Sequence, residues 1–340
     1  MTTNIDELKD RIGETRQSVT GFRIEAGKVA EFARAIGDDN PAYRDEAAAR
    51  DQGFSAIPAP LTFTRVSMFP RYRPVDAPRL GVDIGFDIRR EIHGEQEYEF
   101  ERPVFVGDVL DGFTTLTDAF QREGSRGGTM TFATLATEYR DADGEPVVTE
   151  RSTIIETERA IDDDTEEEDG VRETDHPERV APRIEGASVS QTDTGYDQPT
   201  YLEDVSEGEI TFELIVQNLT RPDFVRYAGA SGDFNPIHYD EPYARSLGNP
   251  RLFGQGMLTA GYASHFASDW FGVDSIRRFK SRFLDRVWPG DTLTITGTVE
   301  EVDIESGLVT AEIVVDRQTG DPVLDGEIAV DPPSRSDGDG

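Results

Sequence analysis

The sequence contains no cysteine among its 340 residues, which excludes disulfides, thiolate metal sites and cysteine nucleophiles. Its four histidines are widely separated, so no histidine-based metal site is expected. They are His93, His176, His238 and His265. No hydrophobic run approaches the ~20 residues of a membrane span, and the chain begins with polar and acidic residues. We therefore expect a cytoplasmic protein with no membrane partner.

Positive charge is also scarce. The 34 basic residues face 68 acidic ones, which gives a net charge of −34, and lysine occurs only at Lys9, Lys28 and Lys280. Such a field repels nucleic acid and anionic membranes. The acids are spread over the whole chain, as in a surface adapted to high salt, where the Debye length is only ~3 Å at 1 M. The charge thus indicates a halophilic habitat rather than an activity.

The stretch 227–264 concentrates the groups that can carry chemistry. A helix start at Thr220-Arg221-Pro222 predicts a short helix, and Asn235-Pro236 then forces a turn. Asp233 and His238 lie within six consecutive positions of that turn, close enough to hold one water molecule and transfer its proton. In a purely structural alternative, Asp233 only accepts backbone N–H groups of a common turn.

A long apolar run, 257–271, follows Gly254-Gln255-Gly256 and predicts a buried helix with free backbone N–H groups at its glycine-rich start. Such a helix start can stabilise an oxyanion. Together with the Asp and His of the turn, it suits addition of water to an acyl thioester, or its removal, because the intermediate carries negative charge on the thioester oxygen.

These motifs, GDFNPIHYD at 232–240 and FGQGML at 253–258, resemble the MaoC-like (R)-specific enoyl-CoA hydratases. The resemblance implies that Asp233 and His238 are the catalytic pair and that Asn235 supports their turn. It also implies that the backbone N–H of Gly256 binds the oxyanion and that Ser264 assists. One departure is Gln255, where many members have histidine, which bears on the polarity of the pocket.

A CoA thioester is anionic and needs a local basic patch on this acidic chain. The candidates for substrate binding are Arg251, Arg278 and Lys280. No cofactor and no metal is expected.

The turn has a second copy earlier in the chain, at an offset of 195 residues from Gly37 to Gly232. The offset places Asp38 on Asp233, Asn40 on Asn235, Tyr43 on His238 and Asp45 on Asp240. The first copy lacks the imidazole, the group best suited to proton transfer at neutral pH. Prolines at 58 and 60 also remove donors where the second copy has its helix start. We predict that the first half is not catalytic and either serves packing or holds the substrate.

Strands follow the helix in each half. Gly107-Asp108 matches Gly290-Asp291, and each pair opens a series of alternating segments. The expected strands are 109–117, 129–139 and 147–155, then 292–302, 308–315 and 322–330. One long helix wrapped by a curved antiparallel sheet in each half predicts an α+β, double hot-dog fold.

The predicted domains are a non-catalytic hot-dog domain (1–155), an acidic flexible linker (156–196), a catalytic MaoC-like domain (197–331) and a disordered tail (332–340). The linker has seven acids among residues 162–169. The first half resembles the FAS1-like dehydratase N-terminal domain of MaoC proteins. The whole resembles a fused form of the mycobacterial (3R)-hydroxyacyl-ACP dehydratase heterodimer.

The sequence therefore predicts a hydro-lyase that interconverts an enoyl-CoA or enoyl-ACP and a (3R)-3-hydroxyacyl thioester, as a monomer or homodimer. Three alternatives stay open. They are a hot-dog thioesterase, a hydratase of a branched dicarboxylic thioester such as mesaconyl-CoA, and a non-catalytic acyl-thioester binding protein.

Overall fold

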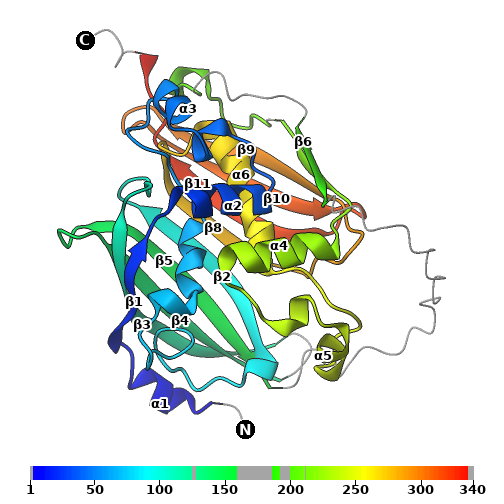
Figure 1. The fold of residues 1–340 in the computed structure, drawn as a ribbon. Coiled ribbons are helices and arrows are strands. Elements are labelled where there is room, and N and C mark those ends of the chain that lie inside the picture. The colour runs from blue at the N-terminus through cyan, green and yellow to red at the C-terminus, as the bar shows by residue number, and fades with distance from the viewer. Residues whose placement is uncertain (1–2, 125–127, 159–185, 192–199, 211, 336–340) are drawn as a thin grey trace.

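One antiparallel sheet forms the frame of the molecule (Figure 1). The computed structural model describes residues 3–124, 128–158, 186–191, 200–210 and 212–335. The eleven strands of this part lie in the order β1-β3-β4-β5-β2-β8-β11-β10-β9-β7-β6. Their bounds are β1 Thr15–Arg23, β2 Glu91–Phe100, β3 Val109–Glu123, β4 Thr129–Arg140, β5 Pro146–Thr157, β6 Ser188–Gln191, β7 Leu214–Gln217, β8 Ile276–Phe283, β9 Leu293–Asp303, β10 Leu308–Arg317 and β11 Pro322–Val330.

The sheet consists of two related halves that join at β2 and β8. The first half contributes β1 to β5, and the second contributes β6 to β11. At the seam, antiparallel pairing places three acids of β2 opposite three bases of β8. The opposed pairs are Glu95 with Arg282, Glu97 with Lys280 and Glu99 with Arg278. The double hot-dog prediction is confirmed, and neither β2 nor β8 was among the predicted strands.

Helices cover one face of this sheet, where α2, α4 and α6 lie together (Figure 1). The α-helices are α1 Ile5–Lys9, α2 Ala26–Ala35, α3 Glu46–Asp51, α4 Arg221–Ser231, α5 Glu241–Ser246 and α6 Gly256–Phe271. Every residue of α6 after Gly256 is buried, as expected of a mainly apolar helix in the interior. α6 packs on β8, β9, β10 and β11.

The first half has no helix of this length in the corresponding place. A short 3₁₀ helix, Phe63–Met68, stands there instead, between Pro58-Ala59-Pro60 and Pro70. Proline lacks a backbone N–H and so prevents a long regular helix. The expectation of a long helix in each half therefore holds only for the second half. Part of the inner face of the first-half sheet is left without a helix, and this difference makes room for a pocket.

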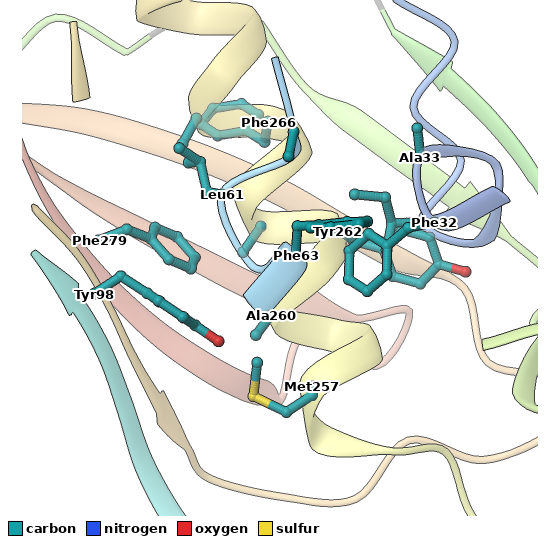
Figure 2. Close-up of a cluster of buried hydrophobic side chains, with 14 of the residues drawn as sticks. Phe32, Ala33, Leu61, Phe63, Tyr98, Met257, Ala260, Tyr262, Phe266 and Phe279 are labelled. Atoms are coloured by element: carbon teal, nitrogen blue, oxygen red, sulfur yellow. The ribbon is translucent and has the colours of Figure 1, made fainter. Parts of the chain in front are cut away.

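One hydrophobic core joins the halves (Figure 2). Tyr98 of β2 and Phe279 of β8 stack across the seam with ring centroids 6.4 Å apart. α6 also approaches α2 closely, because a Cβ on Gly261 would lie 2.4 Å from Cγ2 of Ile36. These contacts join the two halves in a shared hydrophobic core.

The predicted linker and tail are partly described. β5 extends to Thr157, and β6, which lies inside the predicted linker 156–196, pairs with β7. Residues 159–185 and 192–196 of the predicted linker lie outside the described part. At the predicted tail, the Pro333 carbonyl accepts a bond from the Leu202 amide at 3.0 Å, so its first residues are held to the body. Among the described helices, none has the length and apolar character needed to cross a membrane.

Candidate active site

The predicted Asp–His turn, Gly232 to His238, is built on the end of α4. That helix stops at Gly232, whose φ of 83° is left-handed and costs glycine nothing sterically. A 3₁₀ helix, Pro236–His238, follows, and Oδ1 of its cap Asn235 accepts the amide of Ile237 at 3.2 Å. Asp233 and His238 thus project from one turn and line the same pocket.

Asp233 is held as a carboxylate. Its side chain is 17% exposed, and burial alone would raise its pKa. Arg65, whose Nη2 lies 3.5 Å from Asp233 Oδ2, opposes this effect together with His238 and the Asn235 amide, and the pKa of Asp233 is lowered. Asp233 is therefore ionised at neutral pH and can accept a proton.

His238 is held as a neutral imidazole. Burial lowers its pKa, and the nearby Asp233 carboxylate opposes this effect only in part. Its Nδ1 lies 2.9 Å from the Phe253 carbonyl oxygen, which can only accept, so Nδ1 carries the proton. The lone pair is then on Nε2, which can accept a proton in turn.

The start of α6 supplies a possible oxyanion site. α6 begins at Gly256, which lines the pocket, and the first N–H groups of a helix have no partner within it. The preceding Gln255 does not cap the helix, because its Nε2 donates to the Phe224 carbonyl at 3.0 Å. Gln255 is buried and does not line the pocket, so the departure from histidine there does not place a polar side chain beside the substrate.

Both halves build the pocket, which has a volume of about 980 Å³. The second half contributes the Asp–His turn, Gly256, Phe253 and Arg286. The first half contributes Arg65, Arg73 and His93. The predicted non-catalytic half therefore forms much of the wall that a bound substrate would touch.

A row of polar side chains crosses the first-half sheet inside this pocket. We call it the polar belt, and it consists of Ser18, Thr114, Thr137 and Glu150 on β1, β3, β4 and β5. The hydroxyls of Ser18 and Thr114 lie 2.7 Å apart, and those of Thr114 and Thr137 lie 2.8 Å apart. Glu150 accepts bonds from Thr64 at 2.8 Å and Tyr139 at 3.0 Å, and burial raises its pKa.

The remaining predicted residues lie elsewhere. Arg251 lies over the Trp288 ring at 5.0 Å, and the ring of the pocket residue Phe253 is 5.9 Å from the same indole. Arg278 and Lys280 do not line the pocket and form ion pairs with acids of the sheet. Ser264 is buried, donates to the Gly261 carbonyl at 2.8 Å, and also does not line the pocket.

Comparison with known proteins places the chain in a family. Residues 11–150 match the FAS1-like, dehydratase domain region, and residues 208–319 match the MaoC like domain. The chain thus combines a FAS1-like dehydratase region with a MaoC-like domain. A UPF0336 protein of Saccharopolyspora erythraea is 34% identical over 159 residues, which are 46% of this chain and 95% of that protein, so the chain also belongs with the UPF0336 proteins.

Solved structures agree with this assignment. A MaoC-like dehydratase superposes with a TM-score of 0.74 and 27% identity, over 96% of this chain and 99% of that one. A Mycobacterium tuberculosis protein described as having a double hotdog fold gives a TM-score of 0.59 at 15% identity, over 95% and 97% of the two chains. The second likeness supports the fold alone.

Within this MaoC-like chain, the sequence interpretation missed Arg65. It lies in the apolar segment PLTFTRVSM, where Leu61, Phe63 and Val66 are buried. Arginine is rarely buried unless it is paired. An arginine inside a run of core residues was thus a signal for a buried partner, and that partner is Asp233.

One further group of the MaoC-like chain could bring three ligand atoms within 4.8 Å of one another. It consists of Asp38, His265 and Asp269, all of them buried. His265 Nε2 lies 2.9 Å from Asp269 Oδ2 and 3.9 Å from Asp38 Oδ1. At 2.9 Å the imidazole nitrogen donates a proton to the carboxylate and has no lone pair to offer a metal. The geometry is that of a histidine N–H donated to Asp269 beside the buried carboxyl group of Asp38.

Proposed function

We propose that this chain catalyses the reversible hydration of a trans-2-enoyl thioester to a (3R)-3-hydroxyacyl thioester. Water held between Asp233 and His238 adds its oxygen to C3, and one of the pair takes its proton. A proton is returned to C2, so that a whole water molecule is added. The N–H of Gly256 donates to the thioester oxygen while negative charge develops there.

One observation supports this proposal most directly. Asp233 and His238 project from the same turn into the pocket that Gly256 also lines. The pair combines an ionised carboxylate with an imidazole that is neutral at neutral pH, since both pKa values are lowered. Such a pair can hold a water molecule and exchange its proton without an external base.

A thioesterase is the first rival. Thioesterases of this fold more often place an acid on the long helix, and here α6 carries Asp269 as its one acid. Asp269 lies near the far end of α6, bonds to His265 and does not line the pocket. The position of this acid favours hydration over thioester hydrolysis.

The pocket also favours a polar acyl group. A long aliphatic chain would lie against the polar belt and beside Arg73, which lines the same pocket. Arg73 forms no ion pair within 4 Å among the described residues, and its guanidinium bonds the Pro78 carbonyl at 2.6 Å. A short acyl group with a polar end, such as that of mesaconyl-CoA, would satisfy these donors. The carrier is CoA or an acyl carrier protein.

The test follows the enoyl-thioester absorbance band in high salt with crotonyl-CoA, mesaconyl-CoA and longer enoyl-CoAs. Wild type is compared with Asp233→Asn and His238→Ala, and Asp39→Asn, an exposed acid beside the first turn, is the matched control. With wild type we expect loss of the band and a (3R) product. In either site variant we expect the hydration rate to fall roughly 10²–10⁴-fold.

A thiol reagent in the same cuvette separates the rivals. Free thiol would establish a thioesterase. Binding of the thioester without turnover, with the same affinity in Asp233→Asn, would establish a non-catalytic binding protein. A mesaconyl-CoA rate no higher than the rates for long unbranched chains would contradict the preference for a polar acyl group.

A further inference from the structure

Arg65 reaches the Asp–His turn from the other half of the molecule. It lies on the 3₁₀ helix Phe63–Met68 of the first half, and its Nη2 is 3.5 Å from Asp233 Oδ2. The two side chains are 23% and 17% exposed, and both line the pocket. The contact therefore lies beside the place where the substrate would react.

Arg65 has few other partners to satisfy its charge. Asp233 is the carboxylate within 4 Å of it among the described residues. Glu150 is close enough to influence Arg65, but its oxygens are already used by Thr64 and Tyr139. The Nε atom of Arg65 is buried without a hydrogen-bond partner in the described part of the chain. The orientation of Arg65 is thus set by Asp233 more than by any other single group.

A related contact occurs in the first copy of the turn. There the aspartate is Asp38, and the cation that faces it is His265, which α6 of the second half contributes. In each half, a basic side chain from the central helical segment meets the aspartate of the other half's turn. Because the contact recurs between the two halves, the Arg65–Asp233 pair is part of how the halves pack together and is not a chance surface contact.

Resting on the proposed function, we propose that Arg65 is a positioning residue for the reaction, which holds the Asp233 carboxylate in its anionic form and in place. Arg65 does not need to touch the reacting atoms for this role. The first half would then be required for catalysis although its own turn lacks the imidazole.

The electrostatic environment of Asp233 fixes the direction of the expected effect. Charged and titratable groups face it from four elements, namely Arg65 from the 3₁₀ helix, His238 from its own turn, His93 from β2 and Tyr227 from α4. His93 is neutral near pH 7, because burial lowers its pKa to about 4. Without Arg65, burial dominates and the pKa of Asp233 rises. Arg65 also lowers the pKa of His238, so both groups shift upward.

The test measures kcat/KM against pH for wild type, Arg65→Gln and Arg65→Lys with the best enoyl thioester of the panel above. Arg71→Gln is the matched control, because Arg71 is exposed, pairs with Glu25 at 2.7 Å and does not line the pocket. For Arg65→Gln we expect kcat/KM to fall and its acidic limb to move upward by about one pH unit, the lower end of what an adjacent arginine does to an aspartate. Arg65→Lys should return the acidic limb most of the way to its wild-type position.

The outcomes are separable. Wild-type turnover with an unshifted acidic limb in Arg65→Gln overturns the role of Arg65 and leaves the hydratase intact, whether or not the rate falls. No turnover by wild type overturns both. If circular dichroism shows that the glutamine variant does not fold, Arg65→Met, which keeps the aliphatic stem, replaces it under the same criterion.

Discussion

Tyr43 and His238 occupy the same place in two copies of one turn. Each is the last residue of a three-residue 3₁₀ helix, and each helix is capped by an asparagine whose Oδ1 accepts the amide two residues on. The bond lengths are 2.9 Å at Asn40 and 3.2 Å at Asn235. Tyr43 packs in the core, whereas His238 lines the pocket. The two copies thus share the backbone conformation of the turn but differ in the surroundings of its last side chain.

Restoring the imidazole should not create a second active site. In Tyr43→His the new ring would face the core, and no oxyanion donor would stand opposite, because the proline-flanked segment has no long helix start. We expect no activity from Asp233→Asn/Tyr43→His in the enoyl-thioester assay. Turnover in that double variant, measured against Asp233→Asn alone, would show that the first turn still has access to substrate.

The Asp38–His265–Asp269 group should make stability depend on pH. Burial alone would lower the pKa of His265, but Asp38 and Asp269 outweigh it and raise the pKa to about 9. The folded protein therefore binds this proton more tightly than the unfolded chain does. The stabilisation is fully present below about pH 6.5 and is lost as pH rises through about 9, and it is on the order of 1–3 kcal/mol.

Denaturant midpoints between pH 6 and pH 10 check this expectation. Burial raises the pKa of the neighbouring Asp38 to about 7, so this carboxyl also titrates in the range. The double variant His265→Gln/Asp38→Asn should therefore lose most of the decline of stability with pH that wild type shows. His93→Gln is the control, because the pKa of His93 is lowered to about 4 and the ring stays neutral throughout. An unchanged decline in the double variant would show that groups outside this cluster cause it.

The close approach of α6 to α2 should make one glycine intolerant of alanine. A Cβ on Gly261 would lie 2.4 Å from Cγ2 of Ile36, a stiff and fully buried side chain. We expect Gly261→Ala to destabilise the fold by about 1–3 kcal/mol. Gly229→Ala in α4 meets nothing within 4 Å and should be neutral or stabilising by about 0.5–1 kcal/mol. Thermal unfolding of the two variants side by side is the measurement, and equal midpoints would refute the packing argument.

Substitutions of Arg251 and Arg278 should differ in their effect on KM for an enoyl-CoA. Arg251 is exposed and lies over Trp288 next to the pocket residue Phe253, whereas Arg278 is paired with Glu97 and Glu327 in the sheet. At the lowest salt in which the protein stays folded, Arg251→Gln should raise KM for an enoyl-CoA about 5-fold, equivalent to about 1 kcal/mol, with kcat unchanged. Arg278→Gln should leave KM as it is. A short thioester without phosphates should not distinguish wild type from Arg251→Gln, and if it does, the effect is not electrostatic recognition of CoA.

The repeat made much of the fold predictable. Five of the six predicted strands agree with the observed bounds within a residue or two at their starts and ends, and the first, predicted as 109–117, continues as β3 to Glu123. Asp233, His238 and Gly256 line one pocket, as their spacing suggested. Local turn chemistry and strand alternation are short-range signals, and for this reason they could be read from one sequence.

The seam strands β2 and β8 could not be recognised by hydrophobic alternation. Their alternating positions are charged on one face, with Glu95, Glu97 and Glu99 on β2 against the basic residues of β8. Lys280 and Arg278 were instead assigned to CoA. The complementary charge patterns of the two segments were present in the sequence, but their pairing is a tertiary contact between segments far apart in the chain.

The seam also bears on how the chain is made. β2 is synthesised long before β8, so the first half emerges from the ribosome with the hydrogen-bonding edge of β2 uncovered. An open edge invites pairing with another chain. Two copies of β2 would bring glutamates against glutamates, since Glu95, Glu97 and Glu99 alternate along it, whereas β8 brings arginine and lysine. The acidic edge thus discourages self-association of the nascent half and reserves it for the basic strand of its own chain.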